Sequence, residues 1–315
     1  MRSVQLAESS QGPRLVEADA PMPTAKSGDV LVRVCAAGVT PTELLWYPTT
    51  HKKDGSVRMH AIPGHEFSGM VAELGPGVSA FAVGDEVFGM NDWFSDGATA
   101  EYCVAAATEI APKPQRLSHA QAAAVPIGAL TAWQGLIERA KISEGERVLV
   151  HGGAGAVGLF VVQLARLRGA EVIATASKRN ADVVAALGAQ KVIDYAAAPF
   201  EQQVRDVDVV FDCVGGETLR RSWSVLKSGG RMVTIAADSE SQDDPRVKDA
   251  YFIVEPNPQQ LMEIGNLLVA GSLRVFVDGE IALAEAPAAY ERTIQRKLGF
   301  GKTVVVLKQE PGNRE

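Results

Sequence analysis

The sequence has little cysteine, no long apolar run and no excess of basic charge. Only three cysteines occur among 315 residues, Cys35, Cys103 and Cys213, far apart and without CxxC spacing. So few dispersed thiols exclude a disulfide framework, and they favour a reducing, cytoplasmic compartment. The first residues, MRSVQLAESSQGPRL, lack the apolar core of a signal peptide, so we expect no export.

The same scarcity restricts the partners. No stretch approaches the roughly 18–20 apolar residues that a membrane span needs. The formal net charge of −7 offers no basic footprint for nucleic acid or an anionic membrane. With 46% hydrophobic and 22% charged residues the composition is globular, and 315 residues predict two domains. We therefore expect a small-molecule substrate.

The two halves of the chain differ in pattern. Up to about residue 120, short β-like runs alternate with glycine and proline turns, which predicts a barrel or sandwich. These runs cover residues 30–34, 67–74, 86–90 and 100–104.

From about residue 121, strand and helix patterns alternate. The expected strands are 147–150, 171–175, 191–193, 207–213, 231–236 and 273–277, and the expected helices are 155–168, 181–187 and 258–270. Near-continuous Val and Ile runs between helices are typical of parallel strands buried on both faces. The pattern predicts a six-stranded, doubly wound α/β sheet that binds a nucleotide. A last strand, 301–307, is expected to return to the first domain.

A glycine-rich turn is the strongest local signal. Residues 148–158 read VLVHGGAGAVG and satisfy GxGxxG through Gly153, Gly155 and Gly158. A strand ends at this turn, a helix begins in it, and a second strand follows. Glycines let the turn tighten and let backbone N–H groups reach a pyrophosphate at the helix N-terminus. The alternative is a strand-to-helix turn with packing duties alone.

The end of the next strand distinguishes between cofactors. An NAD site usually places Asp or Glu here, on the ribose 2′-hydroxyl. This chain instead has Ser177, Lys178 and Arg179. A hydroxyl and two cations suit a 2′-phosphate, which an arginine binds with two hydrogen bonds. The turn therefore favours NADP(H), with an ordinary solvated basic turn as the alternative.

Several short motifs occur in one order along nearly the whole chain. They are GDVLVRV (28–34), AAGV (36–39), VGDEVFG (83–89), AEY (100–102), GALTAW (128–133), the glycine turn, LGA (187–189) and GK (301–302). In this order they resemble the medium-chain dehydrogenase/reductase family, and specifically its zinc-free quinone oxidoreductase branch. The resemblance implies a GroES-like β-barrel substrate domain (1–121 and 279–315), a Rossmann domain (122–278) and a cofactor in the cleft between them.

The resemblance also implies individual contacts with the cofactor. Thr131 resembles a threonine near the nicotinamide, and Tyr195 a tyrosine on the adenosine phosphate side. The full set of expected cofactor-binding residues is Thr131, Gly153, Gly155, Ala156, Val157, Gly158, Ser177, Lys178, Arg179, Tyr195, Val214, Ile235, Ala236, Phe252, Val254 and Lys302.

The GHE motif at residues 64–66 resembles the zinc-ligand motif of alcohol dehydrogenases in this family. A catalytic zinc needs three protein ligands and an open fourth position. By the resemblance, the two cysteine ligands would fall at Thr40 and near Ile127, and neither side chain is a cysteine. We therefore expect no metal, and we interpret His65 and Glu66 as a hydrogen-bonded pair that shapes the cleft. The alternative is a role in proton transfer.

Without zinc, little polarises an alcohol or a simple ketone. Hydride added to a quinone or an α,β-unsaturated carbonyl gives an anion whose charge is already delocalised. The protein then has only to orient the nicotinamide against the acceptor, donate hydrogen bonds to the acceptor's oxygen and exclude water. The candidate hydroxyl donors are Thr40, Thr42 and Tyr47; quinone oxidoreductases often carry Asn in place of Thr40 and Tyr in place of Leu45.

The sequence thus predicts an NADPH-dependent quinone or enone reductase. The alternatives are an enoyl-thioester reductase and a non-catalytic NADPH-binding protein. Substrate choice is expected to lie in the segments 47–59 and 238–251. The resemblance also implies a homodimer, with residues 273–277 as the candidate edge strand.

Overall fold

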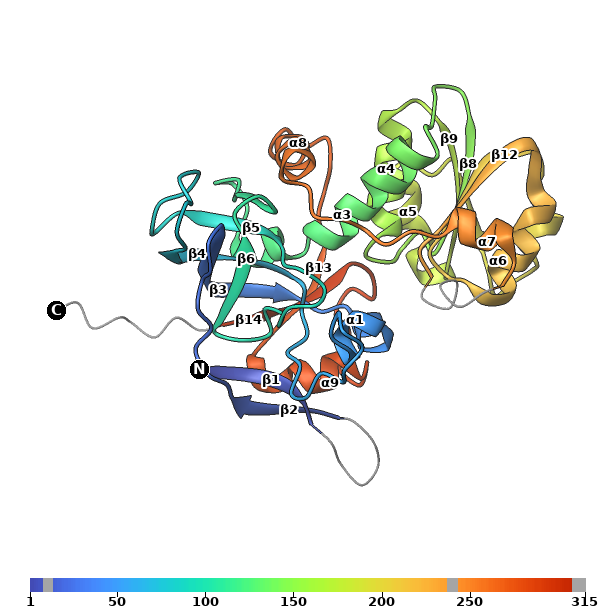
Figure 1. The fold of residues 1–315 in the computed structure, drawn as a ribbon. Helices are drawn as coiled ribbons and strands as arrows, with labels where there is room; N and C mark the ends of the chain where they lie inside the picture. Colours follow the sequence, from blue (N-terminus) through green and yellow to red (C-terminus); the bar gives the residue numbers. More distant parts are fainter. Residues whose placement is uncertain (8–13, 237–242, 308–315) are drawn as a thin grey trace.

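The computed structural model describes residues 1–7, 14–236 and 243–307; residues 238–242 of the second expected specificity segment lie outside them. The described strands form three sheets, which build two lobes (Figure 1). The smallest is a hairpin of β1 (Arg2–Ala7) and β2 (Arg14–Asp19). The two-lobed α/β architecture predicted from the sequence is confirmed.

The first lobe contains a seven-stranded sheet. Its strands are β3 (Asp29–Gly38), β4 (Glu66–Leu74), β5 (Glu86–Met90), β6 (Tyr102–Ala106), β7 (Ile110–Pro112), β13 (Val277–Ile281) and β14 (Lys302–Val306). They lie in the order β13-β14-β3-β4-β5-β7, with β6 paired to β3. Val30, Val32 and Phe67 have no exposed surface, because residues that alternate along a strand share one face. Strand β14 pairs antiparallel with β3, so late residues complete a sheet that early residues begin.

The second lobe contains a five-stranded parallel sheet. Its strands are β8 (Arg147–His151), β9 (Glu171–Ala176), β10 (Lys191–Asp194), β11 (Val207–Asp212) and β12 (Leu226–Thr234), in the order β10-β9-β8-β11-β12. Val148, Val150 and Val209 are fully buried, as the apolar runs predict for strands covered on both faces. Figure 1 shows α4 (Gly158–Leu167) and α5 (Ala181–Leu187) on one side of this sheet and α6 (Gly216–Ser222) and α7 (Pro245–Ala250) on the other.

Helices also join the lobes. They include α2 (His119–Ala123), α3 (Pro126–Trp133) and α8 (Pro258–Val269). The other helices are η1 (Pro41–Leu45), α1 (Tyr47–Thr50), η2 (Gln134–Arg139), η3 (Lys178–Asn180), η4 (Phe200–Gln202), η5 (Trp223–Val225), η7 (Leu283–Glu285) and α9 (Ala286–Tyr290). Helix α3 begins at Pro126, whose missing N–H costs nothing at this position, and it is buried along most of its length. None of the helices in the described chain combines the length and apolar content that crossing a bilayer requires.

The expected sixth strand at 273–277 is wrong. The backbone of Arg274 is held by one side chain: Gln163 Oε1 accepts from its N–H at 2.8 Å, and Gln163 Nε2 donates to its carbonyl at 3.1 Å. Because both groups are taken, this segment does not pair with the parallel sheet. Instead, Tyr251 forms a parallel bridge with Thr234, next to the edge strand β12.

Other differences are smaller. The helix expected from residue 155 begins at Gly158, because the glycines before it form the turn. The strand expected at 100–104 is β6, two residues later. Strand β13 begins at Val277 and belongs to the first lobe's sheet. The domain division at residues 121 and 279 stays a prediction.

Candidate functional site

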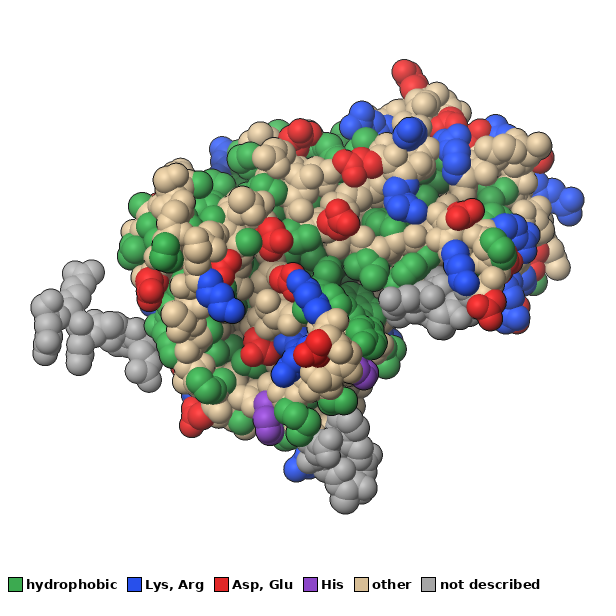
Figure 2. All heavy atoms as spheres, in the orientation of Figure 1, with side chains coloured by type: hydrophobic (Ala, Val, Ile, Leu, Met, Phe, Trp, Pro, Cys, Tyr) green, Lys and Arg blue, Asp and Glu red, His purple; other side chains and the backbone are tan. Residues whose placement is uncertain are grey.

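A cleft of about 430 Å³ lies between the lobes, where β8 and β9 end. The second lobe contributes Gly155, Ser177 and Tyr195 to its lining, and the first lobe contributes Thr40 and Lys302. Figure 2 shows acidic and basic side chains interspersed over one face of the molecule. The cleft, rather than a surface of one charge sign, is therefore the candidate site.

The glycine turn forms one wall of the cleft, and its geometry requires glycine at two positions. A Cβ on Gly158 would lie 2.2 Å from the carbonyl oxygen of Gly152, and a Cβ on Gly153 would lie 2.9 Å from the Cβ of Ala174. The turn ends at the first residue of α4, and Ala156 and Val157 also line the cleft. A helix N-terminus fits the pyrophosphate of a dinucleotide, because the first backbone N–H groups of a helix have no partner within it.

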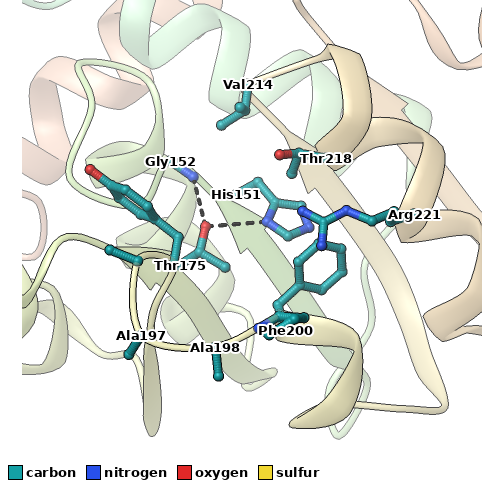
Figure 3. Close-up of a pocket in the computed structure, with 12 residues that line it drawn as sticks. His151, Gly152, Thr175, Ala197, Ala198, Phe200, Val214, Thr218 and Arg221 are labelled. Carbon is teal, nitrogen blue, oxygen red and sulfur yellow. Dashed lines mark hydrogen bonds between the residues drawn. The ribbon is translucent and has the colours of Figure 1, made fainter.

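A second cavity, of about 590 Å³, adjoins the cleft and shares Gly152, Thr175 and Tyr195 with it. Figure 3 shows Phe200, Val214, Thr218 and Arg221 around it. Its mixture of apolar and hydroxyl groups beside a glycine turn fits an adenine ring. The predicted cofactor residues Tyr195 and Val214 both line this cavity.

A directed hydrogen-bond chain holds the glycine turn against α6. Ser222 donates its only hydroxyl proton to the Thr218 carbonyl at 2.6 Å, so it accepts from His151 Nε2 at 2.9 Å. The other ring nitrogen, Nδ1, then accepts from Thr175 Oγ1 at 3.2 Å, and that oxygen accepts from the Gly152 N–H at 3.2 Å (Figure 3).

Burial keeps His151 neutral in this chain. The side chain has no exposed surface, and desolvation, helped by the positive charge of Arg221, lowers the pKa of His151 to about 3. No local sequence pattern reveals the bonds of His151 to Ser222 and Thr175, because these residues lie far apart in the chain.

The basic turn after β9 contacts the first lobe. Lys178 and Arg179 are exposed and Ser177 is half-buried. The Arg179 guanidinium donates to the Gly299 carbonyl at 3.2 Å, and Asn180 Nδ2 donates to the same oxygen at 3.1 Å. Arg179 is therefore partly committed to a contact between the lobes, which sequence reasoning did not foresee.

A buried ion pair stands where a metal site was considered. Lys302 donates to Glu66 Oε1 and, at 2.9 Å, to Thr40 Oγ1. The other oxygen of Glu66 accepts the Ile127 N–H at 2.9 Å. Burial raises the pKa of the Glu66 carboxyl, and the ammonium of Lys302 opposes that change. Both positions that the resemblance aligns with cysteine ligands, Thr40 and Ile127, thus contribute to this network instead.

His65 and Glu66 do not bond to each other, so the predicted pairing is wrong. His65 Nδ1 donates to Glu43 Oε2 at 2.7 Å, and Nε2 lies 3.2 Å from the Ser95 carbonyl. Successive residues of a strand point to opposite faces, which is why the two side chains find different partners. His65, Glu66 and Glu43 are all fully buried.

The described residues contain no group of three or more His, Cys, Asp or Glu side chains able to hold a metal ion. Cys213 lines the cleft, but burial and the neighbouring Asp212 raise the pKa of its thiol. Such a thiol stays protonated and is a poor nucleophile.

The remaining predicted residues are spread around these cavities. Thr42 lines the cleft. Tyr47 is half-exposed and stacks on His51, with ring centroids 4.5 Å apart. Thr131 is buried, and its hydroxyl donates to the Ile127 carbonyl at 2.6 Å. Ala236 and Val254 are buried, whereas Ile235 and Phe252 are half-buried. Neither cavity has these last five among its lining residues.

Two arginines were missed by sequence reasoning. Arg292 and Arg296 both line the cleft, in the segment between α9 and β14. Arg292 has a positive φ of 59°, which is uncommon outside glycine, and no sequence pattern marks it. Arg296 pairs with Asp278 and Lys302 pairs with Glu66, so within the described residues the positive charge that the first lobe adds to this side of the cleft comes mainly from Arg292.

Family models match both halves of the chain. The model described as "Alcohol dehydrogenase GroES-like domain" matches residues 26–115, and the model described as "Zinc-binding dehydrogenase" matches residues 187–305. Among curated relatives, "Probable zinc-binding oxidoreductase, mitochondrial" of Arthroderma benhamiae is 32% identical and covers 90% of each chain. Quinone oxidoreductase of Mus musculus is 30% identical over 98% of each chain. The 2-methylene-furan-3-one reductase of Solanum lycopersicum is 33% identical, over 84% of this chain and 67% of its own.

Solved structures agree with these relatives. The quinone oxidoreductase from Coxiella burnetii superposes with a TM-score of 0.87 at 30% identity, covering 98% of this chain and 99% of its own. The CurK enoyl reductase gives a TM-score of 0.81 at 26% identity, covering 98% and 99%. A mycobacterial protein solved with NADPH gives 0.80 at 26% identity, covering 97% and 100%.

The fold therefore defines an oxidoreductase with a GroES-like lobe and a Rossmann lobe, of a kind that uses a nicotinamide cofactor. The chain belongs to the medium-chain dehydrogenase/reductase family, within its quinone oxidoreductase branch. The resemblance read from the order of short motifs is confirmed.

Proposed function

We propose that the protein is an NADPH-dependent reductase that transfers hydride to a quinone or an α,β-unsaturated carbonyl without zinc. One observation carries the proposal: Thr40, Ile127 and the Glu66–Lys302 ion pair occupy the place where a metal would need its ligands. An ammonium group and an isoleucine are not a donor set for zinc. Acceptors whose product anion is delocalised are those that this cleft can reduce.

Each part of the chain has a distinct task in this proposal. The bound nicotinamide supplies a hydride. The glycine turn and the N-terminus of α4 hold the pyrophosphate, and the second cavity takes the adenine. The two lobes enclose the acceptor and exclude water, which strengthens every hydrogen bond made to the developing anion.

The preference for NADPH rests on the turn after β9. Ser177 and Asn180 line the cleft beside the exposed Lys178 and Arg179, and this turn contains no carboxylate for a ribose 2′-hydroxyl. A 2′-phosphate would give the two cations a partner that NADH lacks. The structural neighbour solved with NADPH supports the same choice.

A specific observation also favours an enoyl-thioester reductase. Arg292 lines the cleft, and Arg296 beside it pairs with Asp278, so Arg292 offers a phosphate-bearing thioester carrier a guanidinium group there. The likeness to the CurK enoyl reductase supports this second candidate. Both candidates reduce a conjugated carbonyl, so they share the hydride transfer. They differ in the group attached to the carbonyl carbon of the substrate.

Purified protein tested against quinones, enals, enones and enoyl thioesters would decide between them. We expect NADPH oxidation with at least one quinone or enone, at a higher kcat/KM than with NADH. Turnover restricted to enoyl thioesters would establish the second candidate. Tight NADPH binding without oxidation by any of these acceptors would overturn the proposal.

A further inference from the structure

Thr40 and Lys302 form a hydrogen-bonded pair that opens on the cleft. Lys302 is only 5% exposed, and its ammonium donates to Thr40 Oγ1 at 2.9 Å and to Glu66 Oε1. An ammonium only donates, so the Thr40 oxygen is the acceptor in this contact. The Thr40 hydroxyl proton is therefore directed away from Lys302.

Among the residues that the structure describes, the acceptor of that proton is a weak one. The distance from Thr40 Oγ1 to Glu66 Oε1 is 3.4 Å, at the long limit for an O–H···O bond. Thr40 is half-buried and lines the cleft. A substrate oxygen in the cleft can take the hydroxyl proton away from Glu66 at little cost.

Glu66 fixes the ammonium rather than the substrate. The carboxylate is fully buried and also accepts the N–H of Ile127 at 2.9 Å. Gly38 leaves room for it, because a Cβ at Gly38 would lie 2.5 Å from Glu66 Oε1. Held on both oxygens, the carboxylate sets the direction in which Lys302 polarises Thr40.

We propose that Thr40, polarised by Lys302, is the catalytic hydroxyl that donates to the substrate oxygen on which negative charge develops, and that Lys302 and Glu66 are its positioning residues. This inference rests on the proposed function. As hydride adds to the carbon of the acceptor, an electron pair moves to the oxygen. That oxygen takes the Thr40 proton, Lys302 returns a proton to Thr40, and solvent returns one to Lys302. In this assignment Lys302 acts on the substrate through Thr40, whereas the sequence analysis predicted that Lys302 binds the cofactor.

Kinetics of three variants test the assignment. Thr40→Val removes the hydroxyl with little change in shape, and Thr40→Ser restores it. We expect Thr40→Val and Lys302→Met to lower kcat about 100-fold, the effect of losing one oxyanion donor. Thr40→Ser should recover most of the rate. Affinity for NADPH, measured by fluorescence titration, should be unchanged in all of them; a phosphate-binding role for Lys302 would instead weaken it.

Lys113→Met is the matched control. Lys113 is also buried in the first lobe and pairs with a glutamate, Glu86, at 3.2 Å, but it does not line the cleft. Its loss should affect stability and leave kcat unchanged. Lys302→Met leaves the buried Glu66 carboxylate unpaired and can fail to fold for that reason. In that case the double variant Glu66→Gln, Lys302→Met, which removes both charges, takes the place of the single variant in the test.

A spectroscopic readout keeps the inference separate from turnover. 4-Nitrophenol bound to the protein with NADP⁺ reports by its absorbance how far its oxygen is ionised. We expect the pKa of the bound phenol to lie below its value in solution, and to rise by about one unit in Thr40→Val and in Lys302→Met. If the pKa of the bound phenol is lowered in both variants as much as in the wild type, the effect comes from Arg292 and Arg296 and the inference is overturned. Wild-type protein that lowers this pKa yet reduces no acceptor would refute only the proposed reaction.

Discussion

His65 Nδ1 lies 2.7 Å from Glu43 Oε2, so the histidine of the GHE motif is held by a carboxylate from η1 and not by Glu66. Its second ring nitrogen faces the Ser95 carbonyl at 3.2 Å. Both ring nitrogens thus face oxygen atoms of the protein. A zinc ligand needs a free lone pair on one of these nitrogens.

We therefore predict that purified protein contains no stoichiometric zinc. Elemental analysis after purification without added metal should find far less than one equivalent. Treatment with a chelator should leave NADPH oxidation unchanged, because no step depends on a metal. One equivalent of zinc whose removal abolishes activity would show that His65 breaks its bond to Glu43 to bind metal.

The second prediction concerns the basic turn. Replacing both Lys178 and Arg179 by alanine should weaken NADPH binding about 30- to 150-fold, because two half-exposed charged contacts contribute roughly 2–3 kcal/mol. NADH binding should hardly change. Isothermal titration of both cofactors measures this, and added salt should weaken NADPH more than NADH.

Lys191→Ala is the control for this pair, since Lys191 is exposed but begins β10, at the other end of the strand from the cleft. Equal wild-type affinities for the two cofactors would contradict the assignment of the turn. Arg179→Ala alone should cost less than Lys178→Ala alone if its bond to Gly299 persists when NADPH binds.

The third prediction follows from the neutral His151. Its pKa falls from an ordinary 6.5 to about 3 in the folded protein. Between these values the unfolded chain binds a proton that the folded chain does not, so stability falls as pH drops below 6.5. At about pH 5 the loss should be about 2 kcal/mol.

Urea unfolding at about pH 5 and about pH 7.5 checks this prediction. In His151→Gln the free energy of unfolding should depend less on pH over this range, whatever the baseline loss of stability. His60→Asn is the control, because His60 is exposed and asparagine tolerates its positive φ of 55°. Equal pH slopes in wild type and His151→Gln would mean that the histidine is charged in the folded state.

The fourth prediction concerns assembly. The Tyr251–Thr234 bridge places the segment from Tyr251 to Val254 beside the edge of the parallel sheet, and Ile253 is 44% exposed there. We predict a homodimer that pairs this segment with its copy, because an apolar side chain exposed beside the edge of a sheet favours a partner. Sedimentation should show a dimer at micromolar concentration, and Ile253→Asp should yield a folded monomer. A monomeric wild type would refute the prediction.

Sequence reasoning succeeded where a pattern is local. The glycine turn, α5 and the buried valines of β8 follow from spacing and hydrophobic runs, and their positions are confirmed. The strand at 273–277 failed because an apolar run cannot reveal that the Gln163 side chain takes the backbone bonds of Arg274.

The candidate site was predictable only in part, for the same reason. Thr40, Glu66 and Lys302 were each noticed, but their contact joins residues from three distant parts of the chain. Glu43 carries no motif at all, and only the folded strand order places it against His65. Side-chain partners of this kind depend on tertiary packing, which spacing along the chain does not encode.

The order of strands has a consequence for synthesis of the protein. Strands β8 to β12 are contiguous in the chain, so the parallel sheet can close as soon as residue 234 has left the ribosome. The first lobe must wait, because β14 pairs with β3 and comes last. Until then the carboxylate of Glu66 has no ammonium beside it, since Lys302 is the first residue of β14. A nascent chain can thus complete its parallel sheet before Lys302 reaches Thr40 and Glu66.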